Sequence, residues 1–443
     1  MTYKEALEYL DSFIDYEKMS FFDYKESLRL ERMQRFSEKL GNPHLDLRCI
    51  HIAGTKGKGS TAAMVASILK KAGYKTGLYT SPHLVSFRER IKINDEPISE
   101  SELSGLIERM KPVLEETDKK SDESPTFFEI CTALAFLYFK EKKADFCVLE
   151  VGMGGRLDAT NIIKPSCCGI TQISLEHTQK LGKTLEKIAR EKAEIIKKDS
   201  ICVSSLQDDS ARGVIRKTCE DKHCRLYEVG RDLHFDQDPA RAVFEGKQAF
   251  SVKGVFQEYP DLELNLLGHH QLMNAATAIG LIESLRFYDI IVRYNAVKDG
   301  LRNVNWPGRL QVIRNNPYVV LDGAQNRASA RALKEAVKKI FDYNKLILVL
   351  GISKDKDKKA ICEELAPISD SIILTKAKSP RAEEPMAIKQ YFKKDARCTT
   401  SVEEAMHVAE GMAKAPDLIL VTGSLFVVGE VLEKNSTKEL SYA

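Results

Sequence analysis

Short apolar runs alternate with longer amphipathic segments through the first half of the chain. Apolar runs of strand length are typical of buried strands, whereas the longer amphipathic stretches are typical of helices. The regular alternation of the two predicts an α/β fold built on a mostly parallel sheet. The predicted strands are residues 49–53, 75–79, 145–151, 168–173 and 201–203, and the predicted helices are residues 61–72, 100–116, 126–140, 184–197 and 207–220.

Three segments within this half have other patterns. Residues 3–41 carry apolar positions at helical spacing and run into a Gly-Asn-Pro stop, which predicts helix that ends there. Residues 87–99 are polar and alternating, and we expect a mobile loop or a hairpin. Residues 117–124 are rich in acids and lysines, which is typical of a solvated surface loop.

The pattern changes again before a second α/β unit. Residues 225–267 are strand-rich and predict a small antiparallel annex, and residues 268–286 predict a helix whose small side chains suit close packing. Asn-Trp-Pro-Gly-Arg then interrupts the pattern, so we place an interdomain linker at residues 305–310, between domains at 1–304 and 311–443. The second domain has predicted strands at 319–321, 346–350, 371–374 and 418–421, and a helix at 328–340.

Composition and charge narrow the class of protein. The 443 residues, 43% hydrophobic and 30% charged, fit a soluble globular protein of two domains. A net charge of +3 over 67 basic and 64 acidic side chains gives no reason to expect a nucleic-acid or membrane partner. Ten cysteines without a C-x-x-C pair are typical of free thiols, and residues 1–22 lack the pattern of a signal peptide. We therefore expect a cytoplasmic protein.

A glycine-rich turn between the first strand and its helix carries the clearest functional signal. Its spacing, Gly-x-x-Gly-Lys-Gly-Ser, is a shorter variant of the phosphate-binding loop Gly-x4-Gly-Lys-Ser/Thr. Glycines let backbone N–H groups and the positive end of the helix face an anion, and the flanking strand and helix disfavour a plain connector. The predicted phosphate-binding residues are Gly54, Thr55, Lys56, Gly57, Lys58, Gly59 and Ser60.

Polar side chains also follow the carboxyl ends of other predicted strands, where α/β proteins place their chemistry. Ser81 follows the second strand, and His177 follows the fourth and is a candidate metal ligand. Glu150 ends an apolar strand, and because an unpaired buried carboxylate is costly, a divalent metal ion near the phosphates would stabilise it. Lys192 lies on the small-residue side of a predicted helix, where burial would make its amine reactive.

Three neighbouring patterns have simpler interpretations. Thr126 and Glu129 have the spacing of a capping box, so Glu129 is first of all a helix cap. The glycines of residues 152–155 resemble a dinucleotide fingerprint but lack its third glycine and its helix. The lysines of residues 354–359 form either an anion site or, more simply, a solvated loop.

Taken together, these motifs resemble the folylpolyglutamate synthase and dihydrofolate synthase family, a branch of the Mur ligases. The resemblance covers nearly the whole chain, and the order and spacing of the motifs make a chance match improbable. The motifs are HIAGTKGKGS (51–60), YTSPHL (79–84), FRERIKIN (87–94), LEVGMGGRLDATN (149–161), LEHT (175–178), IAREKAEIIK (188–197), NAATA (274–278), WPGRLQ (306–311), DGAQN (322–326) and DKD (355–357).

The resemblance implies an N-terminal ATP-binding domain, a C-terminal Rossmann-like domain and a reaction in the cleft between them. It implies an ATP-dependent ligase of folate biosynthesis that joins L-glutamate to a pterin-linked carboxylate. Dihydropteroate and a tetrahydrofolate polyglutamate both fit as acceptors. In such enzymes the acceptor takes the γ-phosphoryl group as an acyl phosphate, which the amine of glutamate attacks. This chemistry needs positioning and charge neutralisation more than a protein nucleophile. The resemblance also fits a monomer.

The resemblance further assigns roles to matching positions. It implies catalytic roles for Lys58, Lys192 and His177, with Lys192 carbamylated. It implies two Mg²⁺ ions, one held by Ser81 and Glu150 and one by His177. In the acceptor site, Phe127 or Phe128 would stack on the pterin and Asp158 would accept its amino hydrogens. The implied ATP contacts outside the loop are Asn274, Arg309 and Asp322, and the implied acceptor site is Ser27, Thr126, Phe127, Phe128, Glu129, Leu157, Asp158 and Ala159.

The chain departs from the family pattern at several site positions. Lys56 replaces the usual asparagine, and Glu176 and Gln179 stand where aspartates are common. Gln325 and Arg327 stand where the family usually has His and Pro. Because glutamine is neither a general acid nor a cation, we expect ATP binding to survive this change better than amide formation.

Two other functions share parts of the pattern. A nucleotide-dependent switch or binding module would use the same phosphate loop without ligating anything; Gln325 leaves this alternative open, whereas Glu150, His177 and Lys192 argue against it. A cell-wall Mur ligase would carry a further domain before the loop, and the 53 residues that precede Gly54 are too few for one.

Overall fold

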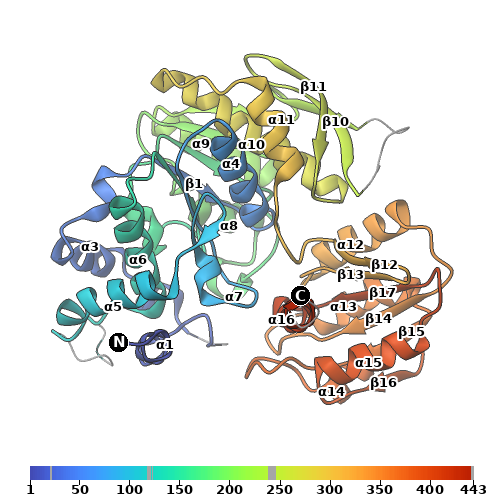
Figure 1. Cartoon of the computed structure of the whole chain (residues 1–443). Coiled ribbons are helices and arrows are strands. Elements are labelled where there is room, and N and C mark those ends of the chain that lie inside the picture. The colour runs from blue at the N-terminus through green and yellow to red at the C-terminus, as the bar shows by residue number, and fades with distance from the viewer. Residues whose placement is uncertain (20–21, 117–120, 122, 238–245, 441–443) are drawn as a thin grey trace.

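The computed structural model describes residues 1–19, 22–116, 121, 123–237 and 246–440. Figure 1 shows two α/β bodies, and the chain passes from the first to the second after helix α11 (Tyr294–Asn303). Most of the loop predicted at residues 117–124 lies outside the described residues. The predicted fold class is confirmed, with a large parallel sheet in the first body and a second sheet towards the C-terminus.

The first body is built around a sheet with a parallel centre. Its order over the described residues is β4-β3-β2-β5-β1-β6-β7-β8, and β3 with β4 forms an antiparallel hairpin at one edge, within residues 87–99. Ile52 of the central strand β1 pairs with both Glu150 and Gly169, so the carboxyl ends of β1, β5 and β6 open side by side. The strands are β1 (Cys49–Ala53), β2 (Thr76–Tyr79), β3 (Ile91–Ile93), β4 (Glu96–Pro97), β5 (Phe146–Glu150), β6 (Cys167–Ile170), β7 (Ile201–Ser204) and β8 (Arg225–Glu228).

Helices cover both faces of this sheet, which explains why its central strands are apolar at successive positions. In β5, Phe146 and Val148 belong to the core under one set of helices, and Cys147 and Leu149 belong to the core under another. The first set is α4 (Lys58–Lys71), α10 (His269–Ser284) and α11, and the second set includes α5 (Glu100–Leu114) and α6 (Phe127–Glu141), with α8 (Leu185–Ala193) and α9 (Asp209–Asp221) beyond them over β6 and β7.

The predicted antiparallel annex is present, but its predicted start was wrong, because residues 225–228 form β8 at the edge of the main parallel sheet. It consists of β9 (His234–Gln237), β10 (Gln248–Lys253) and β11 (Glu258–Leu264) in the order β11-β10-β9. Phe250 and Tyr259 of the annex are buried in the same core as the helices α10 and α11. The annex therefore holds α10 in place, and α10 carries Asn274 to the phosphate loop.

The prediction of continuous helical structure over residues 3–41 was wrong in its middle. Three separate helices form there: α1 (Tyr3–Asp11), α2 (Tyr24–Ser27) and α3 (Leu30–Lys39). Asp23 starts α2 by accepting hydrogen bonds from two backbone N–H groups, and the connecting segment is held to α6, since Phe127 N–H donates to the Ile14 carbonyl at 2.9 Å. The predicted stop was right, because α3 ends just before Gly41.

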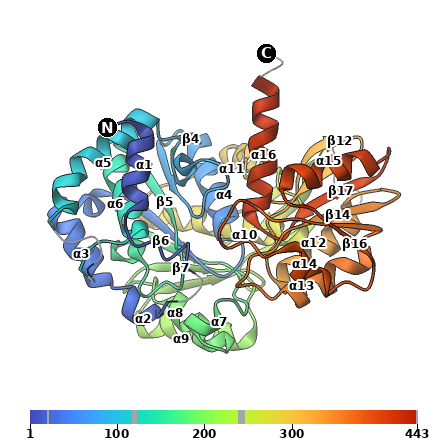
Figure 2. The same cartoon turned by 90° about the horizontal axis from the view of Figure 1, so that it is seen from below.

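The second body repeats the α/β plan around a six-stranded sheet of order β12-β13-β17-β14-β15-β16, counted over the described residues. β12 (Gln311–Asn315) is antiparallel to its neighbour and the other strands are parallel. Figure 2 shows α16 projecting beyond the rest of this body. The other elements are β13 (Tyr318–Leu321), β14 (Leu346–Leu350), β15 (Ser371–Leu374), β16 (Ala396–Cys398), β17 (Leu418–Thr422), α12 (Arg327–Ile340), α13 (Lys358–Leu365), α14 (Pro385–Lys389), α15 (Val402–Met412) and α16 (Leu425–Leu440).

Successive residues of β14 face opposite layers of helices, as expected of a Rossmann-like domain. Leu348 packs in the core beneath α12, whereas Val349 packs in the core beneath α15. The linker at residues 305–310 stays a prediction. None of the described helices combines the length and hydrophobicity needed to cross a membrane.

Helices α11 and α4 pack so closely that a side chain at Gly300 would collide with the opposite backbone. A Cβ built there would lie 2.5 Å from the Ile68 Cα. We expect Gly300→Ala to lower the free energy of unfolding by about 1–3 kcal/mol, because the two helices must move apart. Urea titration followed by circular dichroism measures this loss.

Gly105→Ala is the matched control, since Gly105 lies inside α5 and a Cβ there meets nothing within 4 Å. That exchange should raise the free energy of unfolding by up to about 1 kcal/mol. Equal effects of the two substitutions would contradict the close approach of α11 and α4.

Candidate active site

A cavity of about 870 Å³ lies between the two bodies, at the carboxyl ends of β1, β2 and β5. Loops that follow β13, β14 and β15 form its other side. The predicted site residues that line it are Thr55, Lys56, Gly57, Lys58, Gly59, Ser60, Ser81, Thr126, Phe128, Glu129, Glu150, Leu157, Asp158, Ala159, His177, Asn274, Arg309 and Asp322. Gly54 and Lys192 line a small adjoining cavity of about 20 Å³, and Ser27 and Phe127 lie outside both.

The phosphate loop joins β1 to α4 and is fixed from two sides. The N–H groups of Thr55 and Lys56 donate to the carbonyl of Gln172 at 3.0 and 3.1 Å. Gly57 has φ +85° at the start of α4, and a Cβ there would lie 2.2 Å from Asn274 Oδ1. Since N–H groups in the first turn of a helix have no intrahelical acceptor, the start of α4 presents donors to an anion in the cavity.

Glu150 is a buried carboxylate whose negative charge is only partly offset by neighbouring groups. Burial raises the pKa of Glu150, and Lys58, whose Nζ lies 3.9 Å away, offsets only part of that effect. Ser81 N–H donates to the other carboxylate oxygen at 3.3 Å. These oxygen donors fit Mg²⁺, which proteins commonly hold through one or two carboxylates together with substrate phosphates. The described residues contain no group of three or more His, Cys, Asp or Glu arranged for a metal ion, and a site completed by phosphates needs none.

His177 lies at the start of the short helix α7 (Thr178–Leu181), with φ +51°. It is exposed where it lines the cavity, and desolvation by the surrounding protein lowers the pKa of its imidazole to about 4. The ring is therefore neutral near pH 7, the form that binds a metal ion.

Lys192 lies behind the phosphate loop. Its Nζ donates to the Gly54 carbonyl at 2.7 Å. Burial, followed by repulsion from Lys58, lowers the pKa of Lys192 to about 7. A substantial fraction of the molecules thus carries a neutral amine near pH 7, directly beside the loop.

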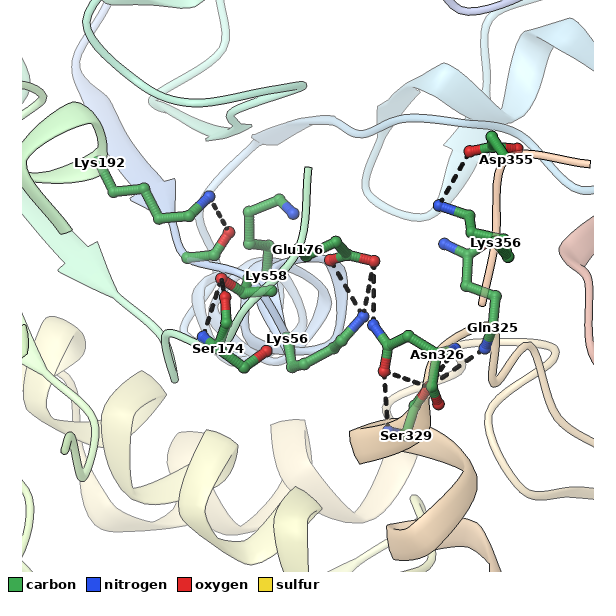
Figure 3. A network of polar contacts seen from close by, with 12 residues as sticks. Lys56, Lys58, Ser174, Glu176, Lys192, Gln325, Asn326, Ser329, Asp355 and Lys356 are labelled. Carbon is green, nitrogen blue, oxygen red and sulfur yellow. Dashed lines mark hydrogen bonds and ion pairs between the residues drawn. The ribbon is translucent and has the colours of Figure 1, made fainter. Parts of the chain in front are cut away.

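Glu176 links the phosphate loop to the second body (Figure 3). Its carboxylate accepts hydrogen bonds from Lys56 Nζ at 3.0 and 3.1 Å and from Asn326 Nδ2 at 3.0 Å. Burial alone would raise the pKa of Glu176, but Lys56 and His177 hold it below its usual range. Lys56 and Glu176 are two of the departures from the family pattern, and here they neutralise each other.

The second body contributes an ordered turn after β13. Asp322 is buried and accepts hydrogen bonds from Leu310 N–H and Ala324 N–H, both at 2.8 Å. This arrangement brings Arg309 beside Asp322, where its charge offsets part of the rise that burial causes in the pKa of Asp322. Gln325 follows, and Figure 3 shows its side chain extending toward Lys356.

The side chains predicted for the acceptor differ in their availability. The capping box of Thr126 and Glu129 is confirmed, and Arg32 also pairs with the Glu129 carboxylate at 2.8 Å, so Glu129 is fully used within the protein. Phe128 reaches the cavity, whereas Phe127 is buried in the core.

Asp158 lines the cavity but already accepts hydrogen bonds from several groups of the protein. It accepts hydrogen bonds from Met153 N–H at 2.9 Å, Thr160 N–H at 3.0 Å and the Thr160 hydroxyl at 2.5 Å. The Thr160 hydroxyl lies 2.8 Å from Nε2 of His51 on β1.

Several residues of the cavity were not predicted. The interpretation of residues 354–359 as a solvated loop was wrong for Lys356, whose side chain is 10% exposed and lines the cavity. Its sequence signals were the DKD motif and the alternative interpretation of these lysines as an anion site. Asn326 was part of the DGAQN motif but had no assigned role. The other unpredicted lining residues include Tyr16, Phe22, Lys180 and Arg381, for which no local pattern gave a signal.

Comparisons with known proteins agree with this two-part site. Residues 52–282 match the Mur ligase middle domain, and residues 308–425 match the Mur ligase glutamate ligase domain. The dihydrofolate synthase/folylpolyglutamate synthase of Bacillus subtilis is 36% identical over 412 residues, covering 91% of this chain and 94% of that protein. The chain belongs to the folylpolyglutamate and dihydrofolate synthases of the Mur ligase family. It is thus an ATP-dependent ligase.

Two further relatives support this assignment of the ligase. The folylpolyglutamate synthase of Lacticaseibacillus casei is 32% identical, with 97% of this chain and 98% of that protein covered. A structure of Mycobacterium tuberculosis folylpolyglutamate synthase, complexed with ADP and AMPPCP, superposes with a TM-score of 0.86 at 31% identity, covering 93% of this chain and 96% of that chain.

The pairing of Lys56 with Glu176 can be measured by a double-mutant cycle. We expect Lys56→Gln and Glu176→Gln each to lower the free energy of unfolding, because each leaves a largely buried charge without its partner. The double variant should lose less than the sum, by a coupling of roughly 0.5–3 kcal/mol. Urea titration of the four ligand-free proteins gives this coupling.

The exposed pair Lys18–Asp11, 2.8 Å apart, is the control. Its coupling should be below about 1 kcal/mol. Additive effects of the Lys56 and Glu176 substitutions would contradict the account of mutual neutralisation.

The low pKa of Lys192 predicts a pH dependence of stability. Folded protein loses this proton near pH 7, whereas the unfolded chain keeps it up to about pH 10.4, so between these values the unfolded state binds more protons. Lys192 therefore makes the free energy of unfolding rise with pH from about 7 to 10. We expect Lys192→Met to remove this rise, as measured by urea titration at several pH values. Parallel curves for the two proteins would refute a low pKa.

Proposed function

We propose that this ligase adds L-glutamate to a pterin-linked carboxylate, either dihydropteroate or a tetrahydrofolate polyglutamate, in folate metabolism. ATP activates the acceptor as an acyl phosphate. The amine of glutamate attacks the acyl carbon, and phosphate leaves as the amide forms. The names of the relatives support this substrate class.

The observation that carries the proposal is the single cavity shared by the two bodies. Lys58 and Glu150 from the first body and Asp322 and Asn326 from the second line the same 870 Å³ space. A bound nucleotide at the loop would thus meet an acceptor and an amino acid without leaving the protein. Proximity of this kind accounts for a large part of the rate enhancement of two-substrate reactions.

The phosphate loop holds the nucleotide in this proposal. Lys58 and the N–H groups at the start of α4 bind the β- and γ-phosphates and neutralise charge during transfer. Asn274, Arg309 and Asp322 contact the rest of the nucleotide, with Arg309 in the linker and Asp322 beyond it. The domain division at residues 305–310 belongs to the same proposal.

Two Mg²⁺ ions complete the nucleotide site, one held by Ser81 and Glu150 and one by His177. The buried carboxylate and the neutral imidazole described above fit these roles. When bound, such ions shield the negative acceptor from the negative phosphates. We also assign Lys192 as a carbamylated lysine, since carbamylation requires the neutral amine that its low pKa provides.

The acceptor lies, in this proposal, against the wall formed by Phe128, Leu157 and Asp158. Phe128 offers a ring face to the pterin, and Asp158 retains acceptor capacity for an amino group. Ser27 and Phe127 lie outside the cavity and support this wall from behind. The protein would act as a monomer in the cytoplasm.

A direct assay tests the proposal. Purified protein is supplied with ATP, Mg²⁺ and L-glutamate, together with either dihydropteroate or tetrahydrofolate, and both ADP release and product mass are followed. We expect ADP release that depends on glutamate with at least one acceptor, because ligation consumes ATP only when the acyl phosphate is captured.

Reactions without acceptor, and reactions without glutamate, are the controls. ADP release that is indifferent to glutamate would instead favour a nucleotide-dependent switch. Product with one added glutamate from dihydropteroate and further additions to tetrahydrofolate would identify a bifunctional enzyme.

A further inference from the structure

Lys180 is a partly buried cation of the cavity that forms no ion pair within the part of the chain that the structure describes. It lies on α7, and its Nζ is 3.5 Å from the centre of the Phe22 ring. Among the described residues no carboxylate forms an ion pair with it. An anion bound beside this ammonium group would supply a counter-charge.

The second body adds positive charge on the facing wall, and the nearby carboxylates do not balance it. Asp355 already pairs with Arg381 at 2.9 Å and Lys356 at 3.4 Å. Glu17 is held by Arg90 at 2.6 Å. These carboxylates therefore leave the positive charge of Lys180 unbalanced at a place where the two bodies meet. Figures 1 and 2 both show α7 at the edge of the first body that faces the second.

We propose that Lys180 and Arg381 form a subsite for the carboxylates of a γ-linked glutamyl tail on the acceptor. The subsite rests on the ligase function proposed above and specifies which acceptors that function prefers. Each γ-glutamyl unit carries one α-carboxylate on its Cα and contributes two CH2 groups to the chain of the tail. Lys180 binds the carboxylate as a charge-assisted hydrogen-bond donor, and Phe22 packs against the CH2 groups.

The position of the two cations favours the tail of the acceptor over the incoming amino acid. Lys180 packs on Phe22, whose ring centre is 4.6 Å from that of Tyr16, and both rings line the cavity. Arg381 reaches the same N-terminal segment, since its guanidinium donates to the Glu17 carbonyl at 2.9 Å. This segment continues to Leu28, which lines the cavity together with the acceptor wall. A tail that extends from that wall would pass both cations.

The subsite has a consequence for substrate preference. A monoglutamate acceptor has a single α-carboxylate close to the reacting group, whereas a longer tail has additional carboxylates. If Lys180 binds one of these, the enzyme recognises acceptors that it has already extended, and the KM falls as the tail grows.

The test compares tetrahydrofolate acceptors with one and with three glutamates. We expect Lys180→Met, which keeps the length of the stem and removes the charge, to raise the KM ratio of tri- to monoglutamate acceptor by roughly tenfold. Lys180→Arg should restore most of the ratio. Lys183→Met is the matched control, because Lys183 is exposed nearby and does not line the cavity. Calorimetric titration with free tri-γ-glutamate, which needs no turnover, should show weaker binding to the Lys180→Met protein than to wild type.

The outcomes separate the subsite from the overall function. A rise in the KM for L-glutamate with an unchanged acceptor ratio would assign Lys180 to the incoming amino acid and overturn the proposal. Unchanged KM values, or an equal effect of Lys183→Met, would also overturn it. Absence of glutamate-dependent turnover in the wild type would refute the ligase function itself. If the wild type is active and Lys180→Met has the same KM values, only the subsite is refuted.

Discussion

The removal of charged groups from bulk water is the constraint on which this structure depends. Three charged residues lie around the phosphate loop, where the sheet and its helices limit contact with solvent: Glu150 at the end of β5, Lys58 at the start of α4 and Lys192 on α8. Burying charges is unfavourable unless partners and hydrogen bonds compensate, and here the internal partners compensate only in part. The remaining imbalance is what anionic substrates and their cations would correct. This imbalance favours the binding of ligands and lowers the stability of the ligand-free protein.

Between the phosphate loop and the start of α12, the two bodies are joined by one carboxylate more than by apolar packing. Glu176 binds Lys56 of the phosphate loop and Asn326 at the start of α12 at the same time. A single side chain thus joins the loop to the second body. The pair Lys56–Glu176 also explains how two departures from the family pattern are tolerated together, since the added positive charge meets a carboxylate of suitable length.

The sequence predicted those parts of the structure that depend on local patterns. The strand, loop and helix of residues 49–72 follow from an apolar run, glycine spacing and helical periodicity, and Glu150 was detectable as a polar residue ending an apolar strand. Residues 3–41 were mispredicted because the break depends on the Asp23 cap and on a contact with α6. Lys180, Lys356 and Arg381 came from separate segments, and only the tertiary fold brings them to one cavity.

A buried chain of hydrogen bonds runs from His51 through Thr160 to Asp158, which lines the cavity. The direction of donation along this chain is fixed. The Thr160 hydroxyl has one proton, which goes to Asp158, so the proton between His51 and Thr160 must come from Nε2 of the imidazole. The other ring nitrogen, Nδ1, is buried and has no hydrogen-bond partner among the described residues. The imidazole is thus restricted to one tautomer, and the orientation of a carboxylate at the surface of the cavity is set by a ring in the middle of the sheet.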